Sequence, residues 1–179
     1  MTELGWIAFL RGINVGGHNR LPMADLRRVC EQHGCSSVTT YIQSGNVLFW
    51  SDISDHAALG RLLEGAIETN LGVSTPVVLR TFTELGQVAG SHPFGADTSR
   101  SHVSFLAGSP RRDGGASLAE VDVAPDRFEL RGSDVFLQYP NGVHGSRLTP
   151  ALLERHLGVA GTVRNWRTVT RLAELAETG

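Results

Sequence analysis

The sequence predicts an α+β protein in which a β-α-β-β-α-β unit occurs twice, with the two halves packed as one domain. Two observations predict this fold class. Short apolar runs alternate with segments whose apolar residues recur at helical spacing, and the order of these elements is the same in both halves. The tripeptide Leu-Gly-Val also recurs, at 71–73 and again at 157–159. We therefore expect one half at residues 1–90 and the other at 91–179.

The first half carries clear strand and helix signals. Residues 4–11 form an apolar run that is too short for a typical helix, so we expect a buried strand there. Pro22 suits the first turn of a helix, and Asp55 can accept a backbone N–H at the start of a second one. The elements predicted after the first strand are a helix from Pro22 to Gly34, strands at 38–42 and 46–50, a helix from Asp55 to Leu71, and a strand at 76–80.

The second half repeats this order after a connector at residues 83–100, which we expect to open with a helical turn. Thr149 followed by Pro150 is typical of a helix N-cap and first turn. Residues 108–117 have the composition of a mobile surface loop. The predicted elements are a strand at 102–107, a short helix at 117–123, strands at 128–131 and 135–139, a helix from Pro150 to Leu157, a strand around Val163, and a final helix at 166–176.

This order of elements is that of the ferredoxin-like fold, which brings two polar segments together. The third strand of such a unit lies between the first and the second and runs opposite to both. Loop 11–20, at the end of the first strand, should therefore meet the hairpin tip at 43–46. Backbone N–H groups, a helix N-terminus and guanidinium groups at one edge suit an anion. The predicted ligand-binding residues at this edge are Arg11, Gly12, Asn14, Gly16, Gly17, Asn19, Arg20, Gln43, Ser44 and Asn46.

A purely structural explanation of loop 11–20 remains open beside the ligand site. Its glycines would then only permit positive φ angles, and its asparagines would hydrogen-bond locally. The loop sequence is neither a dinucleotide-binding fingerprint nor a Walker loop, so the motif itself names no ligand.

A second polar group of candidates lies near the end of the chain. Arg164, Asn165 and Trp166 combine a cation, an amide and an aromatic ring, and would close the ligand site if the second half folds against the same edge. The alternative is a helix entry, in which Trp166 packs in the core and Asn165 caps the last helix.

Composition excludes several classes of function. The net charge is −2, whereas a protein that binds duplex nucleic acid normally carries a clear positive excess. No lysine is present, which excludes a lysine Schiff base and a Walker lysine. The signatures of the common hydrolases and zinc proteases are also missing. The sequence therefore identifies neither a catalytic residue nor a cofactor, and both stay unknown at this point.

The two cysteines, Cys30 and Cys35, are too few for a disulfide framework. With His33 they could offer three soft metal ligands, but a structural zinc site needs four and no partner motif is present, so no metal site is predicted. The start of the sequence lacks a basic leader and a long apolar run, and we expect a cytoplasmic protein with no membrane span.

Four strings give the sequence a family resemblance that covers nearly the whole chain. On these strings it resembles the bacterial domain-of-unknown-function family 1697. The resemblance implies a duplicated ferredoxin-like α+β fold, and it implies no activity, cofactor or catalytic residue. The strings are Phe-Leu-Arg-Gly-Ile-Asn-Val-Gly-Gly at 9–17, Pro-Met-Ala-Asp-Leu-Arg at 22–27, Tyr-Ile-Gln-Ser-Gly-Asn-Val at 41–47 and Arg-Asn-Trp-Arg-Thr-Val at 164–169.

The leading hypothesis of function is the binding of a small anionic or phosphorylated metabolite by loop 11–20 and hairpin 43–46. Whether a reaction follows binding is left open, as is the oligomeric state. Two other hypotheses compete with it. One is a single-stranded nucleic-acid module, because ferredoxin-like sheets can present aromatic rings to bases. The other is a structural or interaction protein without a small ligand.

Overall fold

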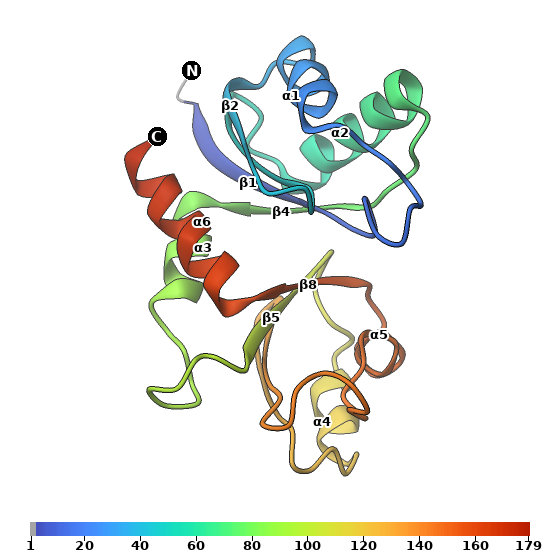
Figure 1. Ribbon diagram of the computed structural model, residues 1–179, viewed down its shortest axis with the longest axis vertical. Helices are drawn as coiled ribbons and strands as arrows, with labels where there is room; N and C mark the ends of the chain where they lie inside the picture. The colour runs from blue at the N-terminus through green and yellow to red at the C-terminus, as the bar shows by residue number, and fades with distance from the viewer. Residues whose placement is uncertain (1–2) are drawn as a thin grey trace. The chain divides into compact units, whose positions relative to one another are not determined.

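The computed structural model of the protein describes residues 3–179 and divides into two compact units. The first unit runs to Gly86 and also includes Leu172–Gly179, and the second spans Gln87–Arg171. Each unit contains a four-stranded antiparallel sheet with two helices interleaved between its strands (Figure 1). The predicted α+β fold, a tandem of ferredoxin-like units, is confirmed.

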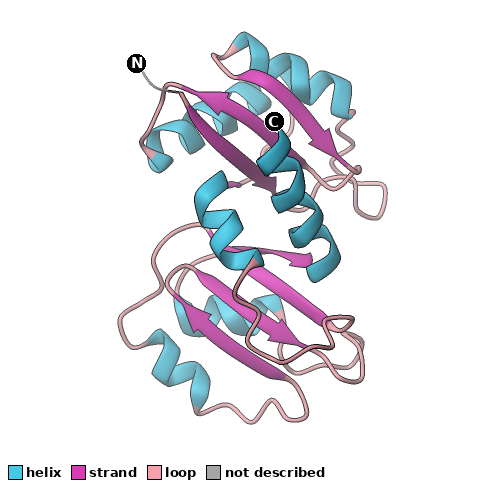
Figure 2. Ribbon diagram, turned by 90° about the vertical axis from the view of Figure 1, so that its left-hand side faces the viewer, coloured by secondary structure: helices cyan, strands magenta, loops and turns pink. Residues whose placement is uncertain are grey.

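Figure 2 shows the helices in cyan and the strands in magenta, and these elements follow the predicted order in both units. The first unit consists of β1 (Leu4–Leu10), α1 (Met23–Gln32), β2 (Ser36–Tyr41), β3 (Asn46–Ser51), α2 (His56–Leu71) and β4 (Val77–Thr81). The connector contains α3 (Phe82–Ala89). The second unit consists of β5 (Ser101–Leu106), α4 (Gly114–Ala119), β6 (Arg127–Arg131), β7 (Asp134–Gln138), α5 (Pro150–Leu157) and β8 (Gly161–Asn165), and α6 (Trp166–Thr178) follows.

The strand order places the third strand of each unit where the sequence predicts it. The first sheet has the order β2-β3-β1-β4 and the second has the order β6-β7-β5-β8. In the first sheet β3 lies antiparallel to both β1 and β2, and Phe9 is paired with Asn46 at the end of β1. The end of β1 therefore lies beside the β2–β3 hairpin.

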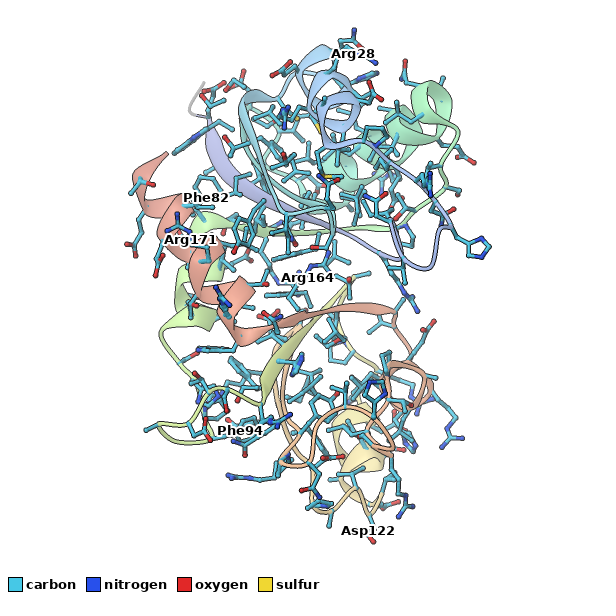
Figure 3. The ribbon with its side chains drawn as sticks, in the orientation of Figure 1. Arg28, Phe82, Phe94, Asp122, Arg164 and Arg171 are labelled. Atoms are coloured by element: carbon cyan, nitrogen blue, oxygen red, sulfur yellow. The ribbon has the colours of Figure 1, made fainter. Side chains whose placement is uncertain are left out.

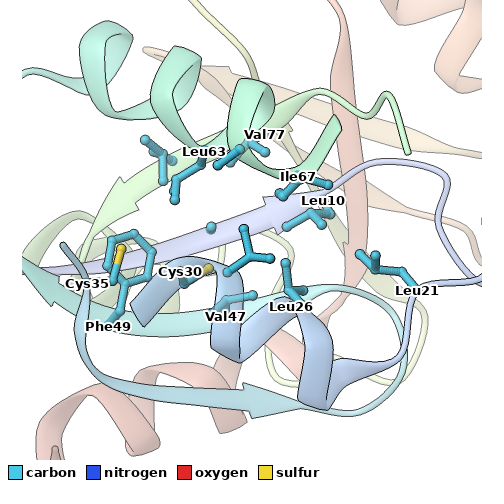
Figure 4. Packing of buried hydrophobic residues seen from close by; sticks show 14 of the residues in the cluster. Leu10, Leu21, Leu26, Cys30, Cys35, Val47, Phe49, Leu63, Ile67 and Val77 are labelled. Carbon is cyan, nitrogen blue, oxygen red and sulfur yellow. The ribbon is translucent and has the colours of Figure 1, made fainter. Parts of the chain in front are cut away.

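The core of the first unit lies between its sheet and the helices α1 and α2, which cover one face of the sheet (Figure 4). Alternate residues of β1, Trp6, Ala8 and Leu10, point to this face and are almost completely buried. Leu26 of α1 and Leu63 of α2 pack against them. The apolar residues that alternate along β1 and those at helical spacing along α1 and α2 therefore pack together in one layer.

The second unit has its own core and repeats the helix signals of the first. Leu118 of α4, Leu137 of β7 and Leu153 of α5 belong to this core. The second helix of each unit ends at a glycine in the left-handed region, Gly72 with φ 67° and Gly158 with φ 70°, as the recurring Leu-Gly-Val predicts. Between residues 3 and 179, no helix combines the length and the apolar content needed to cross a membrane.

The position of α4 differs from the prediction. We predicted a loop at 108–117 and a helix at 117–123, but the helix spans Gly114–Ala119. The cause is tertiary packing, because a Cβ atom at Gly114 would lie 2.9 Å from the carbonyl oxygen of His156 at the end of α5. Gly114, which suggests a loop, is here the residue that lets α4 approach the end of α5 closely, and Gly115 lies against the Leu130 side chain of β6.

Helix α3 begins with a capping box that sequence reasoning missed. The Thr81 hydroxyl accepts the backbone N–H of Glu84 at 3.1 Å, and the Glu84 carboxylate accepts the backbone N–H of Thr81 at 2.6 Å. His56 also lies 3.1 Å from this carboxylate. Burial alone would raise the pKa of Glu84, but the hydrogen bonds from Thr81 and His56 outweigh it and hold the pKa below its ordinary value of 4.5.

We expect Glu84→Ala to lower the free energy of unfolding by about 1 kcal/mol at pH 7, which is the usual effect of losing a helix cap. The loss stays this small because the carboxylate is 41% exposed. A lowered pKa means that the stabilisation is complete above pH 4.5 and disappears as the pH falls through the folded-state pKa. When the wild-type protein and Glu84→Ala are unfolded in urea between pH 7 and pH 3, the difference between their free energies of unfolding should shrink as the pH falls. The control is Glu68→Ala, an exposed α2 residue; an equal pH-dependent loss there would contradict the assignment.

The last helix, α6, starts in the second unit, and its final residues belong to the first. Within the first unit, Leu175 of α6 lines a pocket of about 160 Å³ together with Trp50 and Phe82. The Phe82 ring (Figure 3) packs over Gly5 so closely that a Cβ atom there would overlap it. This end of α6 is therefore an integral part of the first unit's packing.

Candidate functional site

Loop 11–20 and the hairpin tip at 43–46 lie side by side, as predicted from the strand order. The backbone N–H of Leu10 donates to the carbonyl oxygen of Gly45 at 2.8 Å. The side-chain amide of Asn14 donates to the carbonyl oxygen of Gln43 at 2.7 Å. The first contact continues the sheet and the second joins loop to hairpin, so the two segments form one polar edge.

The tip of the loop is a tight turn. The backbone N–H of His18 donates to the carbonyl oxygen of Val15 at 3.0 Å, and the two residues between them, Gly16 and Gly17, have φ angles of 58° and 79°. Positive φ at both central positions is the mark of a type I′ turn, which glycine adopts without strain. The turn requires glycines whether or not a ligand binds.

Asn14 organises the rest of the loop. Its side-chain amide nitrogen also donates to the carbonyl oxygen of Leu21 at 3.0 Å, and its side-chain oxygen accepts the backbone N–H of Leu21 at 2.8 Å. Asn19 donates to the carbonyl oxygen of Gly12 at 3.2 Å. Both asparagines have positive φ, 54° for Asn14 and 49° for Asn19. The local hydrogen bonding that we considered as an alternative to ligand binding is confirmed for both side chains.

The hairpin is held by its own buried amide. Asn46 is completely buried, and its side-chain nitrogen donates to the carbonyl oxygen of Tyr41 at 3.1 Å and to the Ser44 hydroxyl at 2.9 Å. Gly45 has a φ of 75°, and a Cβ atom there would lie 2.6 Å from the Ile13 side chain. Asn46 and Ser44 therefore fix the shape of the hairpin.

A pocket of about 390 Å³ opens between the loop and the hairpin. Among the described residues, the Arg20 guanidinium forms no hydrogen bond or ion pair, and the side chain is exposed at the pocket wall. Four predicted site residues line the pocket together with Leu21 and Pro22; these four are Asn14, Gly17, Arg20 and Gln43. The other predicted residues of this edge, Arg11, Gly12, Gly16, Asn19, Ser44 and Asn46, lie in the same loop or hairpin without lining it.

The backbone of Arg11 anchors the start of the loop. Its N–H donates to the carbonyl oxygen of Pro76 at 3.2 Å, and its carbonyl oxygen accepts the Thr75 hydroxyl at 2.7 Å. The residue thus ties the loop to the segment that precedes β4. Of the two arginines predicted at this edge, Arg20 is the one that reaches the pocket.

The three candidates near the chain end belong to the second unit. Arg164 (Figure 3) is buried in β8, donates to the Thr162 hydroxyl at 2.7 Å, and has its pKa lowered to about 10 by burial. Trp166 is only 7% exposed, and the side-chain oxygen of Asn165 accepts the backbone N–H of Thr168 at 2.8 Å. The helix entry with a packed tryptophan and an asparagine cap is confirmed.

Asn165 and Trp166 also line a second pocket, of about 620 Å³, within the second unit. Beside it, the hydroxyl of Ser101 lies 2.8 Å from Nε2 of His92. Sequence reasoning missed this pair, because a serine in a strand and a histidine in the connector match no catalytic motif. Nothing in their spacing could have distinguished them from other serines and histidines.

The two cysteines lie in the first core, 2% and 5% exposed, and their thiols hydrogen-bond to each other. That hydrogen bond, together with burial, raises the pKa of Cys30. His33 lies with Nδ1 2.8 Å from the carbonyl oxygen of Val29. Across residues 3–179, no group of three or more His, Cys, Asp or Glu side chains is placed to hold a metal ion.

Comparison with known proteins identifies the family. The model of a family described as proteins of unknown function, DUF1697, matches residues 3–136. A solved structure of a conserved bacterial protein from Streptococcus pneumoniae has a TM-score of 0.76 and 21% sequence identity, and the match covers 98% of this chain and 99% of that one. At this identity the similarity shows the fold alone. No curated protein matches the chain. The chain belongs to the DUF1697 family of proteins of unknown function, as its sequence strings indicate.

Proposed function

We propose that the protein binds a small anionic or phosphorylated ligand, in the cytoplasm, in the pocket between loop 11–20 and hairpin 43–46. The observation that carries this proposal is the Arg20 guanidinium, exposed on the pocket wall and without a partner among the described residues. Guanidinium groups bind phosphate and carboxylate through paired N–H donors.

Two further groups support Arg20. The backbone N–H of Gly17, also on the pocket wall, is accepted by no other described residue, and the side chain of Gln43 adds an amide. Asn14 contributes differently from what the sequence suggests. Its three hydrogen bonds hold the pocket in shape, and both N–H groups of its side-chain amide already donate within the protein. The remaining predicted residues, from Arg11 to Asn46, then act as the frame of the pocket.

We expect Arg20→Ala to weaken the binding of inorganic phosphate or pyrophosphate by about 10- to 100-fold, the usual effect of losing a charge-assisted hydrogen bond in a site. Isothermal titration of the full-length protein at fixed ionic strength measures this directly. Thermal unfolding without ligand should stay nearly unchanged, because Arg20 is exposed and has no partner to lose.

The matched control is Arg28→Ala on α1, which removes the same charge outside the pocket. Arg28 is exposed and paired with Asp25 at 2.7 Å. Equal weakening by both variants would mean that only overall charge matters, and no binding to the wild-type protein would favour a structural role without a small ligand. Labelled RNA in the same titration would identify the nucleic-acid alternative, since such binding weakens steeply with salt.

A further inference from the structure

The serine and histidine beside the second pocket have defined hydrogen-bonding roles. Nδ1 of His92 lies 3.0 Å from the carbonyl oxygen of Gly95, and a carbonyl oxygen can only accept. Nδ1 must therefore carry the proton, which leaves a lone pair on Nε2 of the neutral ring. Nε2 lies 2.8 Å from Oγ of Ser101, so the serine hydroxyl donates to it. This is the arrangement of a nucleophile and its general base, with a third group orienting the base.

Both residues are fixed by their surroundings. The His92 ring packs edge-on against Trp166, with the centroids 4.7 Å apart, and against Phe94 at 5.7 Å. Ser101 lies at the start of β5, where it pairs with Gln138 and donates its N–H to the carbonyl oxygen of Thr98 at 3.0 Å. The short Oγ–Nε2 distance is thus held by packing on one side and by the sheet on the other.

Ser101 as a residue is only 2% exposed, but it is one of the residues that line the pocket of about 620 Å³. No carboxylate lines this pocket among the described residues, whereas the Arg167 guanidinium is exposed there without a partner among them. The first turn of α6, with Asn165 and Trp166, completes that wall. The wall therefore favours a ligand with a negative charge.

We propose that Ser101 is a nucleophile activated by His92 and that the pocket of the second unit accepts a small ester carrying a negatively charged group. Oγ of Ser101 bonds to the ester carbonyl carbon while its proton passes to Nε2 of His92. The bond from that carbon to the alcohol oxygen then breaks, and the alcohol leaves with the proton from His92. Water hydrolyses the acyl-serine by the reverse proton path, releasing the acid and restoring Ser101. This inference is independent of the anion pocket in the first unit.

The test is covalent labelling of the full-length protein with a fluorophosphonate, followed by peptide mass spectrometry. Attack by Oγ forms an oxygen–phosphorus bond, fluoride leaves, and His92 takes the serine proton. We expect one label, on Ser101, and none on Ser101→Ala. His92→Gln keeps a polar side chain but removes the base, and it should slow labelling by about 10²- to 10⁴-fold.

Ser117 serves as the matched control. It lies 2.8 Å from Nδ1 of His156 but outside the pocket. Ser117→Ala should label like the wild-type protein. Wild-type protein that stays unlabelled, or a label that persists in Ser101→Ala, overturns the proposal. Thermal unfolding of each variant distinguishes a lost nucleophile from a lost fold.

The predicted charge preference has its own test. Arg167→Ala should slow hydrolysis of the anionic ester 4-nitrophenyl succinate by about tenfold or more relative to neutral 4-nitrophenyl acetate. Arg167 is exposed, so the substitution leaves the fold intact. Equal slowing of both esters would mean that Arg167 does not select the charge, and equal rates in wild-type protein and Ser101→Ala would remove the activity from this pocket.

Discussion

Replacing Gly45 by alanine is expected to lower the free energy of unfolding by about 2–5 kcal/mol. Two penalties add. An L-residue other than glycine at a φ of 75° costs about 1–2 kcal/mol, and the new methyl group would lie 2.6 Å from the Ile13 side chain and 2.8 Å from Cβ of Leu10, an overlap of the kind that costs about 1–3 kcal/mol. Urea unfolding followed by circular dichroism measures the sum.

Gly17→Ala is the matched control for Gly45→Ala. Gly17 also has a positive φ, 79°, but no atom lies within 4 Å of the position that its Cβ would take. This variant should therefore show the backbone penalty alone, about 1–2 kcal/mol. Equal losses in the two variants would mean that the hairpin is not packed against β1 and loop 11–20 as described.

Asn14→Gly should lower the free energy of unfolding by about 2–4 kcal/mol and abolish the pocket. Three hydrogen bonds of 2.7–3.0 Å are lost, each contributing about 0.5–1.5 kcal/mol net, while glycine retains the freedom to adopt the positive φ of 54°. The substitution removes the side-chain hydrogen bond that joins the loop to Gln43 of the hairpin. Phosphate binding should disappear together with the stability.

Asn19→Gly is the matched control, because it separates the loss of the Asn14 hydrogen bonds from the effect of introducing a glycine. It makes the same chemical change at a φ of 49°, in the same loop, but removes only one exposed hydrogen bond of 3.2 Å. The expected loss is about 1 kcal/mol, and most of it comes from the greater freedom of glycine in the unfolded chain. If Asn14→Gly were as mild as this, the loop would be held by its turn rather than by Asn14.

Most of the fold could be predicted from the sequence because its signals are local. Asp55 and Thr149 each accept a backbone N–H from the first turn of α2 and α5, and Gly72 and Gly158 end these helices in the left-handed region. The position of α4 could not be predicted in this way. Gly114 is locally typical of a loop, and the close approach of α4 to the carbonyl oxygen of His156, which requires a glycine at this position, has no local signal.

The candidate site could be predicted in its location but not in its division of roles. Strand order alone places the loop beside the hairpin, because β3 must lie between β1 and β2. Which polar side chains point inward depends on hydrogen bonds between segments far apart in sequence, such as the one from Asn14 to Gln43. The pairing of His92 with Ser101 depends on the path of the connector and has no local signal at all.

The chain path of α6 bears on how the molecule is made. During translation, the strands and helices of the first unit emerge from the ribosome early. Leu172–Gly179, which belong to that unit, emerge only after all of Gln87–Arg171. Nascent chains that stop short of these residues lack the segment that borders Trp50 and Phe82. The first unit to be synthesised is therefore the last to be completed, and its maturation waits on the translation of the second.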